Sequence, residues 1–206
     1  PRGHAIGTVY LAILPRIPAY RYPMTPPTHA KPACTYPPTA TLAEIQALLQ
    51  AAPAGHPHLL ANAEDFARLR LSVGQDSLRR TLIETIMAQA DTLAETPPVT
   101  YTKEGRRLLH QSRAALKRIL TLAMAFQLAG DQRHADRAVQ EMLSAAAFPD
   151  WNPSHFLDVG EMTLALAIGY DWLYEVLDEP TRLTIRDAIL NHGISLAETS
   201  PHIHWI

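Results

Sequence analysis

Apolar residues recur every three to four positions along most of the chain after residue 40, which is the spacing that places them on one side of a helix. Proline, glycine and aspartate interrupt this pattern at regular intervals. No stretch after residue 40 alternates convincingly between apolar and polar residues, so we expect no strand there. The pattern predicts helices over 42–52, 63–73, 77–96, 104–129, 131–147, 155–177 and 181–197. Short connections between such helices favour an all-α fold of antiparallel helical hairpins.

The first 40 residues differ from the rest in composition, because they hold nine of the 17 prolines. Proline fixes its own backbone and lacks an amide donor, so this stretch is predicted to be irregular or extended. The predicted domains are therefore a proline-rich segment over 1–40 and a helical domain over 41–206. Within the first segment, the apolar run 5–14 follows Arg2 and has three interpretations: the core of a signal peptide, a buried strand, or the end of a fragment.

The helix predicted over 155–177 is apolar nearly all the way round and follows a loop rich in Pro, Asp and Asn. We expect Ser154 to cap it, and we expect a helix of this kind to lie buried among other helices. Polar groups on a buried helix must be paired or must face a water-filled cleft. The polar groups of this helix are the main candidates for a functional site: His155, Asp158, Glu161, Tyr170 and Asp171.

Composition and charge exclude several classes of function. The formal net charge is −2, and Lys and Arg are spread through the chain, which predicts no nucleic-acid-binding face. No uncharged apolar stretch is long enough to predict a membrane span. The single Cys34 excludes an internal disulfide framework and a cysteine-based metal site. We predict no cofactor and no metal ligand within these 206 residues.

The stretch FPDWNPSHFLDVGEMTLALAIGYDWLYEVL, residues 148–177, resembles the heparinase II/III-like polysaccharide lyases in their N-terminal α/α-toroid domain. Three other parts of the chain show the same resemblance: HPHLL over 56–60 with EDFARL over 64–69; the stretches 108–109, 112–113 and 122–131; and PTRLTIR over 180–186. Together the similar segments cover roughly residues 56–197. The resemblance implies that the helical hairpins form an incomplete α/α toroid.

Lyases of this kind cleave uronic-acid-containing polysaccharides by β-elimination. The C5 proton of a uronate is only weakly acidic. Hydrogen-bond donors or positive charge must therefore neutralise the adjacent carboxylate before a base can remove this proton. In the family the neutralising Asn and the Tyr base follow the GYDWLY hairpin, so the resemblance places the catalytic groups beyond Ile206. We do not assign that role to 191–193 (Asn-His-Gly), which lies inside a predicted helix.

The resemblance also implies an anionic uronate polysaccharide as the partner and a periplasmic or extracellular location, because the substrate is a polymer. A structural metal is possible in a C-terminal region that this sequence does not include. The chain would then contribute the substrate cleft and lack lyase activity alone.

Four residues are predicted to bind substrate: Trp151, Asn152, His155 and Tyr170. In this interpretation the Trp151 ring stacks on a sugar, and Asn152 or His155 donates to hydroxyl or carboxylate groups. The structural alternative is that Trp151 plugs the top of the core and His155 helps to cap the helix. Tyr170 also has a structural alternative within the core.

Asp158, Glu161 and Asp171 are predicted to be structural or to form the rim of the cleft. Asp158 and Glu161 lie three residues apart on one helix face, where they could bind a cation or bond to loop amides, and we favour the amides. Asp171 would orient a neighbouring Arg or backbone amide. His202 and His204 beside Trp205 form a His-x-His pattern without a carboxylate nearby in sequence, so we assign no metal to it.

Two other functions remain open at this stage. One is a non-catalytic helical-repeat interaction module, which would not need the DWNPSH loop. The other is an α/α-toroid glycoside hydrolase, which would need two carboxylates facing each other across the scissile bond. Asp158 and Glu161 lie on one helix and do not provide that arrangement.

Overall fold

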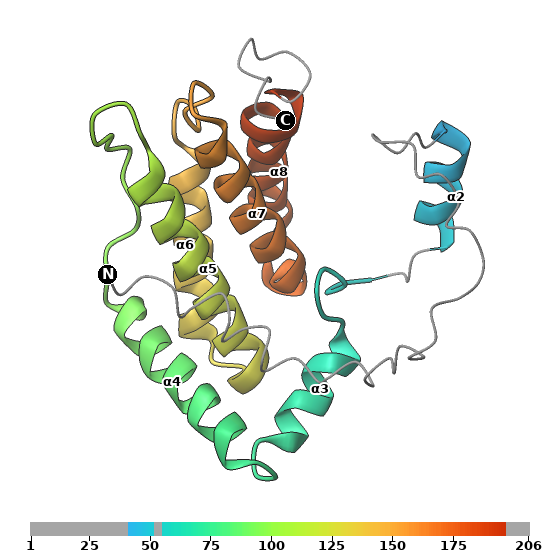
Figure 1. Ribbon diagram of the computed structural model, residues 1–206. Helices are drawn as coiled ribbons and strands as arrows, with labels where there is room; N and C mark the ends of the chain where they lie inside the picture. Colours follow the sequence, from blue (N-terminus) through green and yellow to red (C-terminus); the bar gives the residue numbers. More distant parts are fainter. Residues whose placement is uncertain (1–40, 52–54, 197–206) are drawn as a thin grey trace, which may run out of the picture. The chain divides into compact units, whose positions relative to one another are not determined.

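The computed structural model describes residues 41–51 and 55–196, and this part of the chain is all helical (Figure 1). It contains no strand, only an isolated bridge between Glu104 and Arg107. The all-α prediction is therefore confirmed for the described residues. The predictions for 1–40, including the apolar run 5–14, and those for His202, His204 and Trp205 lie outside them.

The described helices belong to two units. Helix α2 (Leu42–Ala51) belongs to a unit that ends at Gly55, and the helices from α3 onward belong to the other. At the start of α2, the Thr41 hydroxyl accepts a bond from the Glu44 amide, and the Glu44 carboxylate accepts one from the Thr41 amide. These reciprocal bonds form a capping box, which explains why the helix begins here.

The larger unit contains six α-helices and two short helical turns within the described residues. They are α3 (Ala63–Ser72), α4 (Ser77–Ala94), α5 (Leu109–Ala129), α6 (Gln132–Ala146), α7 (Phe156–Trp172), the 3-10 turn η1 (Tyr174–Val176), α8 (Glu179–Ala188) and the π-helix η2 (Ile189–Ile194). None of the helices in this described part combines the length and hydropathy needed to cross a bilayer.

Helix starts follow the expected side-chain caps in most places. Asn62 and Asp65 form a capping box at α3, and Asp131 caps α6. Gly130, with φ of 70°, ends α5 in the left-handed conformation that glycine adopts without steric cost. Ser154 was predicted to cap α7, and this is wrong: the N-cap is His155, and the Ser154 hydroxyl bonds instead to the Asn152 side chain.

Three predicted helices have different bounds in the structure. The helix predicted over 155–177 starts at Phe156 and ends at Trp172, where the 3-10 turn η1 follows it. The helix predicted over 104–129 starts only at Leu109, because Glu104 and Arg107 exchange backbone bonds across a turn in which Gly105 has φ of 61°. The helix predicted over 181–197 begins earlier, at Glu179, and changes to the π-helix η2 after Ala188.

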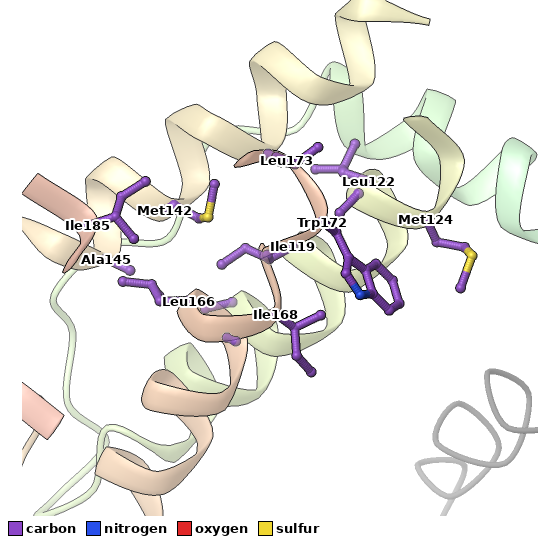
Figure 2. Packing of buried hydrophobic residues seen from close by; sticks show 14 of the residues in the cluster. Ile119, Leu122, Met124, Met142, Ala145, Leu166, Ile168, Trp172, Leu173 and Ile185 are labelled. Carbon is purple, nitrogen blue, oxygen red and sulfur yellow. The ribbon is translucent and has the colours of Figure 1, made fainter. Parts of the chain in front are cut away.

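Helices α5, α6 and α7 pack side by side and form the centre of the core (Figure 1). Figure 2 shows their inward side chains meeting residues from α8. The contact is close at Gly169 of α7, where an added methyl group would lie 2.6 Å from Ile119 and 2.6 Å from Met142. A glycine here lets three helices approach one another. The fully buried residues of this centre include Ile119, Leu122, Met142, Ala145, Leu166 and Ile185.

Candidate functional site

The N-terminal end of α7 is bonded to the start of α5 through Asp158. This carboxylate is fully buried, and its Oδ2 accepts from the Leu108 amide at 2.8 Å and from the Asn152 side-chain amide at 2.7 Å. Leu108 is the N-cap position of α5 and has no side-chain oxygen, so Asp158 provides the acceptor that this helix end lacks. Asp158 thus bonds to a backbone amide across two helices.

Asn152 and Trp151 fix the loop before α7 and are both buried. Asn152 has φ of 58°, a left-handed conformation that Asn tolerates better than most residues, and its side-chain amide also donates to the Arg106 carbonyl at 3.0 Å. The indole of Trp151 is 0% exposed and donates to the Ala145 carbonyl at 3.0 Å. Neither predicted substrate-binding side chain presents a surface to a ligand here, and Trp151 adopts its structural alternative.

Glu161 and His155 complete this end of α7. Glu161 accepts from the Ser112 hydroxyl at 2.6 Å and from Arg113 Nε at 3.4 Å. His155 occupies the N-cap position without a capping bond from its side chain. Its Nδ1 lies 3.3 Å from Asp158 Oδ1, and both atoms are buried without a well-aligned hydrogen bond to any described residue. His155 is about one-third exposed, so it reaches the surface where Trp151 does not.

A basic pocket of about 300 Å³ opens at the start of α5, on the segment that Asn152, Asp158 and Glu161 hold in place. We call it the Arg107 pocket, and its lining residues are Glu104, Arg107, Leu109, His110 and Arg113. The Arg107 Nε is buried and has no hydrogen-bond partner among the described residues. Arg113 is shared with Glu161, at 3.4 Å. The pocket thus combines two guanidinium groups and an imidazole with one carboxylate in its lining.

Sequence reasoning missed this pocket, because the predicted helix began at residue 104. The signal was present: basic side chains recur at Arg107, His110 and Arg113, three positions apart. His110 and Arg113 lie on neighbouring parts of one face of α5, and Arg107 lies in the turn before that helix. The turn at Gly105 then brings Glu104 and Arg107 back against the start of α5.

The C-terminal end of α7 is bonded to the segment before α3 through Asp171. Its Oδ2 accepts from the amides of His58 at 2.8 Å and Leu59 at 2.7 Å, and its Oδ1 lies 2.6 Å from His56 Nδ1. The next residue, Trp172, donates its indole N–H to the Leu59 carbonyl at 2.8 Å. Two adjacent side chains of α7 therefore hold the 56–59 segment.

Tyr170 lies in an aromatic group at this same end of α7. The His56 ring stacks on Tyr174 at 3.8 Å, and the Arg182 guanidinium lies over the Tyr174 ring at 4.3 Å. Tyr170 meets both aromatic rings edge-on, at 6.3 Å from His56 and 5.5 Å from Tyr174. The pKa of the Tyr170 phenol is raised above its ordinary value of 10.0, mainly by burial and to a smaller extent by the nearby Tyr174. A phenol is protonated at neutral pH even at its ordinary pKa, so Tyr170 can donate a hydrogen bond.

The predicted substrate-binding residues do not come together in one groove. Helix α7 rises about 1.5 Å per residue, so Tyr170 lies about 22 Å along it from His155. The polar groups of α7 instead form two separate clusters. One links Asn152, Asp158 and Glu161 to the start of α5 and the turn before it, with His155 beside Asp158. The other joins Tyr170 and Asp171 to the 56–59 segment.

Comparison with known proteins gives no family assignment: no protein-family model and no curated protein matches this chain.

Proposed function

We propose that this chain is the N-terminal, substrate-binding part of a polysaccharide lyase that cleaves uronic-acid-containing polysaccharides by β-elimination. The described helical hairpins would form part of an α/α toroid of the heparinase II/III type. The segment with the resemblance, residues 148–177, contributes the network that holds the Arg107 pocket. That connection between the similar segment and a cationic pocket supports the proposal.

The main support for the proposal is that the buried Nε of Arg107 has no hydrogen-bond partner among the described residues. A buried polar group without a partner is costly, so a ligand that accepts a hydrogen bond there is stabilising. Guanidinium groups bind carboxylates through paired N–H donors, with more geometric specificity than ammonium groups. A uronate supplies such a carboxylate on every acidic sugar, and about 300 Å³ is within the size range of small-ligand pockets.

The acidic residues of α7 do not oppose this binding, because each has a cationic or hydrogen-donating partner. Asp158 accepts from Leu108 and Asn152, and Glu161 accepts from Ser112 and Arg113. The Glu104 carboxylate in the lining would repel a polyuronate, whereas the α7 carboxylates position the α5 residues that would attract it. Their role in the proposal is to hold the pocket.

The proposal assigns binding to this chain and no catalytic base. Tyr170 is the aromatic acid on α7, and its raised pKa makes the phenolate less accessible at neutral pH. It also lies at the opposite end of α7 from the Arg107 pocket. The base and the carboxylate-neutralising Asn would belong to a segment that follows Ile206, and a polymeric substrate would place the protein in the periplasm or outside the cell.

The test is an assay for the unsaturated product of β-elimination, followed by its ultraviolet absorbance. Heparan-, alginate- and hyaluronan-type polymers are each incubated with this 206-residue chain and with a longer protein that continues its reading frame. We expect product from the longer protein only. Product from this chain alone would contradict the claim that it binds substrate without a catalytic base. Absence of product from both proteins would overturn the lyase assignment and favour a helical interaction module.

A further inference from the structure

Three side chains with metal-binding chemistry meet at the C-terminal end of α7. His56 and His58 come from the segment before α3, and Asp171 comes from α7, more than 110 residues further along the chain. One ligand atom of each residue lies within 4.8 Å of those of the other two. The fold therefore assembles two imidazoles and one carboxylate that the sequence separates widely, and sequence analysis assigned no metal ligand here.

The carboxylate of Asp171 is oriented before any ligand binds. Its Oδ2 accepts from the backbone amides of His58 and Leu59, which leaves Oδ1 directed at both histidines. Asp171 is 2% exposed, so the surrounding protein fixes this carboxylate. The His56 ring is fixed as well, by stacking on Tyr174 at 3.8 Å. Outer partners that orient the ligands in this way are characteristic of protein metal sites.

One of the distances already suits a small divalent ion, and the others require a shift of the His56 ring. Two ligand atoms at ordinary zinc bond lengths around a tetrahedral centre lie about 3.4 Å apart. His58 Nδ1 is 3.3 Å from Asp171 Oδ1 already, whereas His56 Nδ1 is 2.6 Å away and would need to move outward. A carboxylate accepts and does not donate, so His56 Nδ1 carries a proton in this arrangement. For His56 to bind the ion through Nδ1, that proton has to shift to Nε2 or leave.

We propose that His56, His58 and Asp171 bind a divalent first-row transition-metal ion of the zinc type, with water completing the coordination. Two imidazoles and a carboxylate form a donor set that binds ions of this type more readily than it binds Mg²⁺ or Ca²⁺. The His58 side chain is 41% exposed, so the ion can enter from solvent and keep a water ligand. Bound there, the ion joins the 56–59 segment to α7. This site is independent of uronate binding at the Arg107 pocket.

The first experiment compares melting temperatures of the tag-free chain with and without Zn²⁺. An ion that binds only the folded state at a hundredfold excess over its Kd raises the melting temperature of a domain this size by about 5 to 10 °C. We expect that rise in the wild type and its loss in His58→Ala, whose side chain is exposed enough for the variant to fold. His192→Ala is the matched control, because it also removes an imidazole and should keep the rise.

A second readout uses Co²⁺, whose visible absorption is strong in four-coordinate sites and weak in water. We expect the strong band in the wild type, its loss in His56→Ala, and its retention when His202 and His204 are both replaced by Ala. The proposal is overturned if Zn²⁺ produces no rise and Co²⁺ no band. It is equally overturned if either signal survives in both His56→Ala and His58→Ala, or disappears with His202 and His204.

Discussion

Buried carboxylates at the two ends of α7 have a common task at the scale of single residues. Asp158 and Asp171 are both almost fully buried, and each accepts bonds from backbone amides of a segment distant in sequence. A carboxylate that accepts such bonds stabilises the segment that donates them, and charge-assisted bonds are stronger than neutral ones. The polar residues of this apolar helix therefore position other parts of the chain.

Replacing Asp158 with Ala should lower the free energy of unfolding by about 2 to 4 kcal/mol, because the Leu108 amide and the Asn152 side chain lose a buried acceptor. Urea denaturation followed by circular dichroism measures the change. Glu179→Ala is the control: this carboxylate is 69% exposed and its pair with Arg182 is 3.7 Å long, so we expect a change below about 0.5 kcal/mol. Equal losses in both variants would contradict the role given to Asp158.

Sequence reasoning identified the polar residues of α7 as important but could not identify their partners. The pattern showed that a buried helix carried groups that need bonds. It could not show that Asp158 meets Leu108, since that contact depends on how α5 and α7 pack. Asn152 looked available for a ligand, and only its φ of 58° and its buried bonds reveal that it shapes the loop.

At the scale of elements, α7 depends on Gly169 for its close packing. Ala at this position would place a methyl group 2.6 Å from Ile119 and Met142, and we expect a loss of about 1 to 3 kcal/mol of stability. Gly160 lies on the same helix with nothing within 4 Å, so Gly160→Ala should stabilise the protein by about 0.5 to 1 kcal/mol. Thermal melts of the two variants measure both effects. A change in melting temperature of the same sign in both variants would be inconsistent with this packing.

The stabilisation that the Asp178 cap gives to helix α8 should depend on pH. Bonds from the Thr181 side chain and then from its backbone amide lower the pKa of Asp178 below its ordinary value of 3.8. The ionised cap therefore stabilises the fold above pH 3.8, and this contribution is lost as pH falls through the lowered folded-state pKa. Asp178→Ala should melt lower than the wild type at pH 7, with a gap that narrows below about pH 4.

Asp178→Asn is the control for that experiment, because Asn also caps helices well but does not titrate. It should melt close to the wild type at neutral pH. A gap between wild type and Asp178→Ala that stays constant down to pH 2 would show that ionisation of Asp178 does not contribute.

Helix periodicity predicted the existence and order of the described helices, while their exact ends depended on local backbone geometry. Residues 104–108 have helix-compatible composition, but the left-handed Gly105 turns the chain before α5 can begin. After Ala188 the backbone widens to a π-helix, and Gly193 approaches Thr163 so closely that an added methyl group would lie 2.5 Å from its hydroxyl. Neither feature has a periodicity that a pattern of apolar residues reveals.

At the scale of the whole larger unit, the two clusters divide α7 into ends with different chemistry. The N-terminal end holds the Arg107 pocket through Asp158 and Glu161, and the C-terminal end gathers His56, His58 and Asp171. Sequence analysis assigned substrate binding to residues at both ends of this helix, His155 and Tyr170. The 17 residues of α7 separate its ends by about 24 Å, so one sugar cannot contact both.

The most direct test of uronate binding is an isothermal titration of this chain with a uronate oligosaccharide and with the same oligosaccharide after its carboxyl groups are reduced to alcohols. Arg107→Gln is measured beside wild type, and Arg80→Gln on α4 is the control with the same change in charge. We predict that carboxyl reduction and Arg107→Gln each weaken binding about tenfold or more, while Arg80→Gln has little effect. Equal affinity for the two sugars, or equal loss in the two arginine variants, would contradict a uronate site at Arg107.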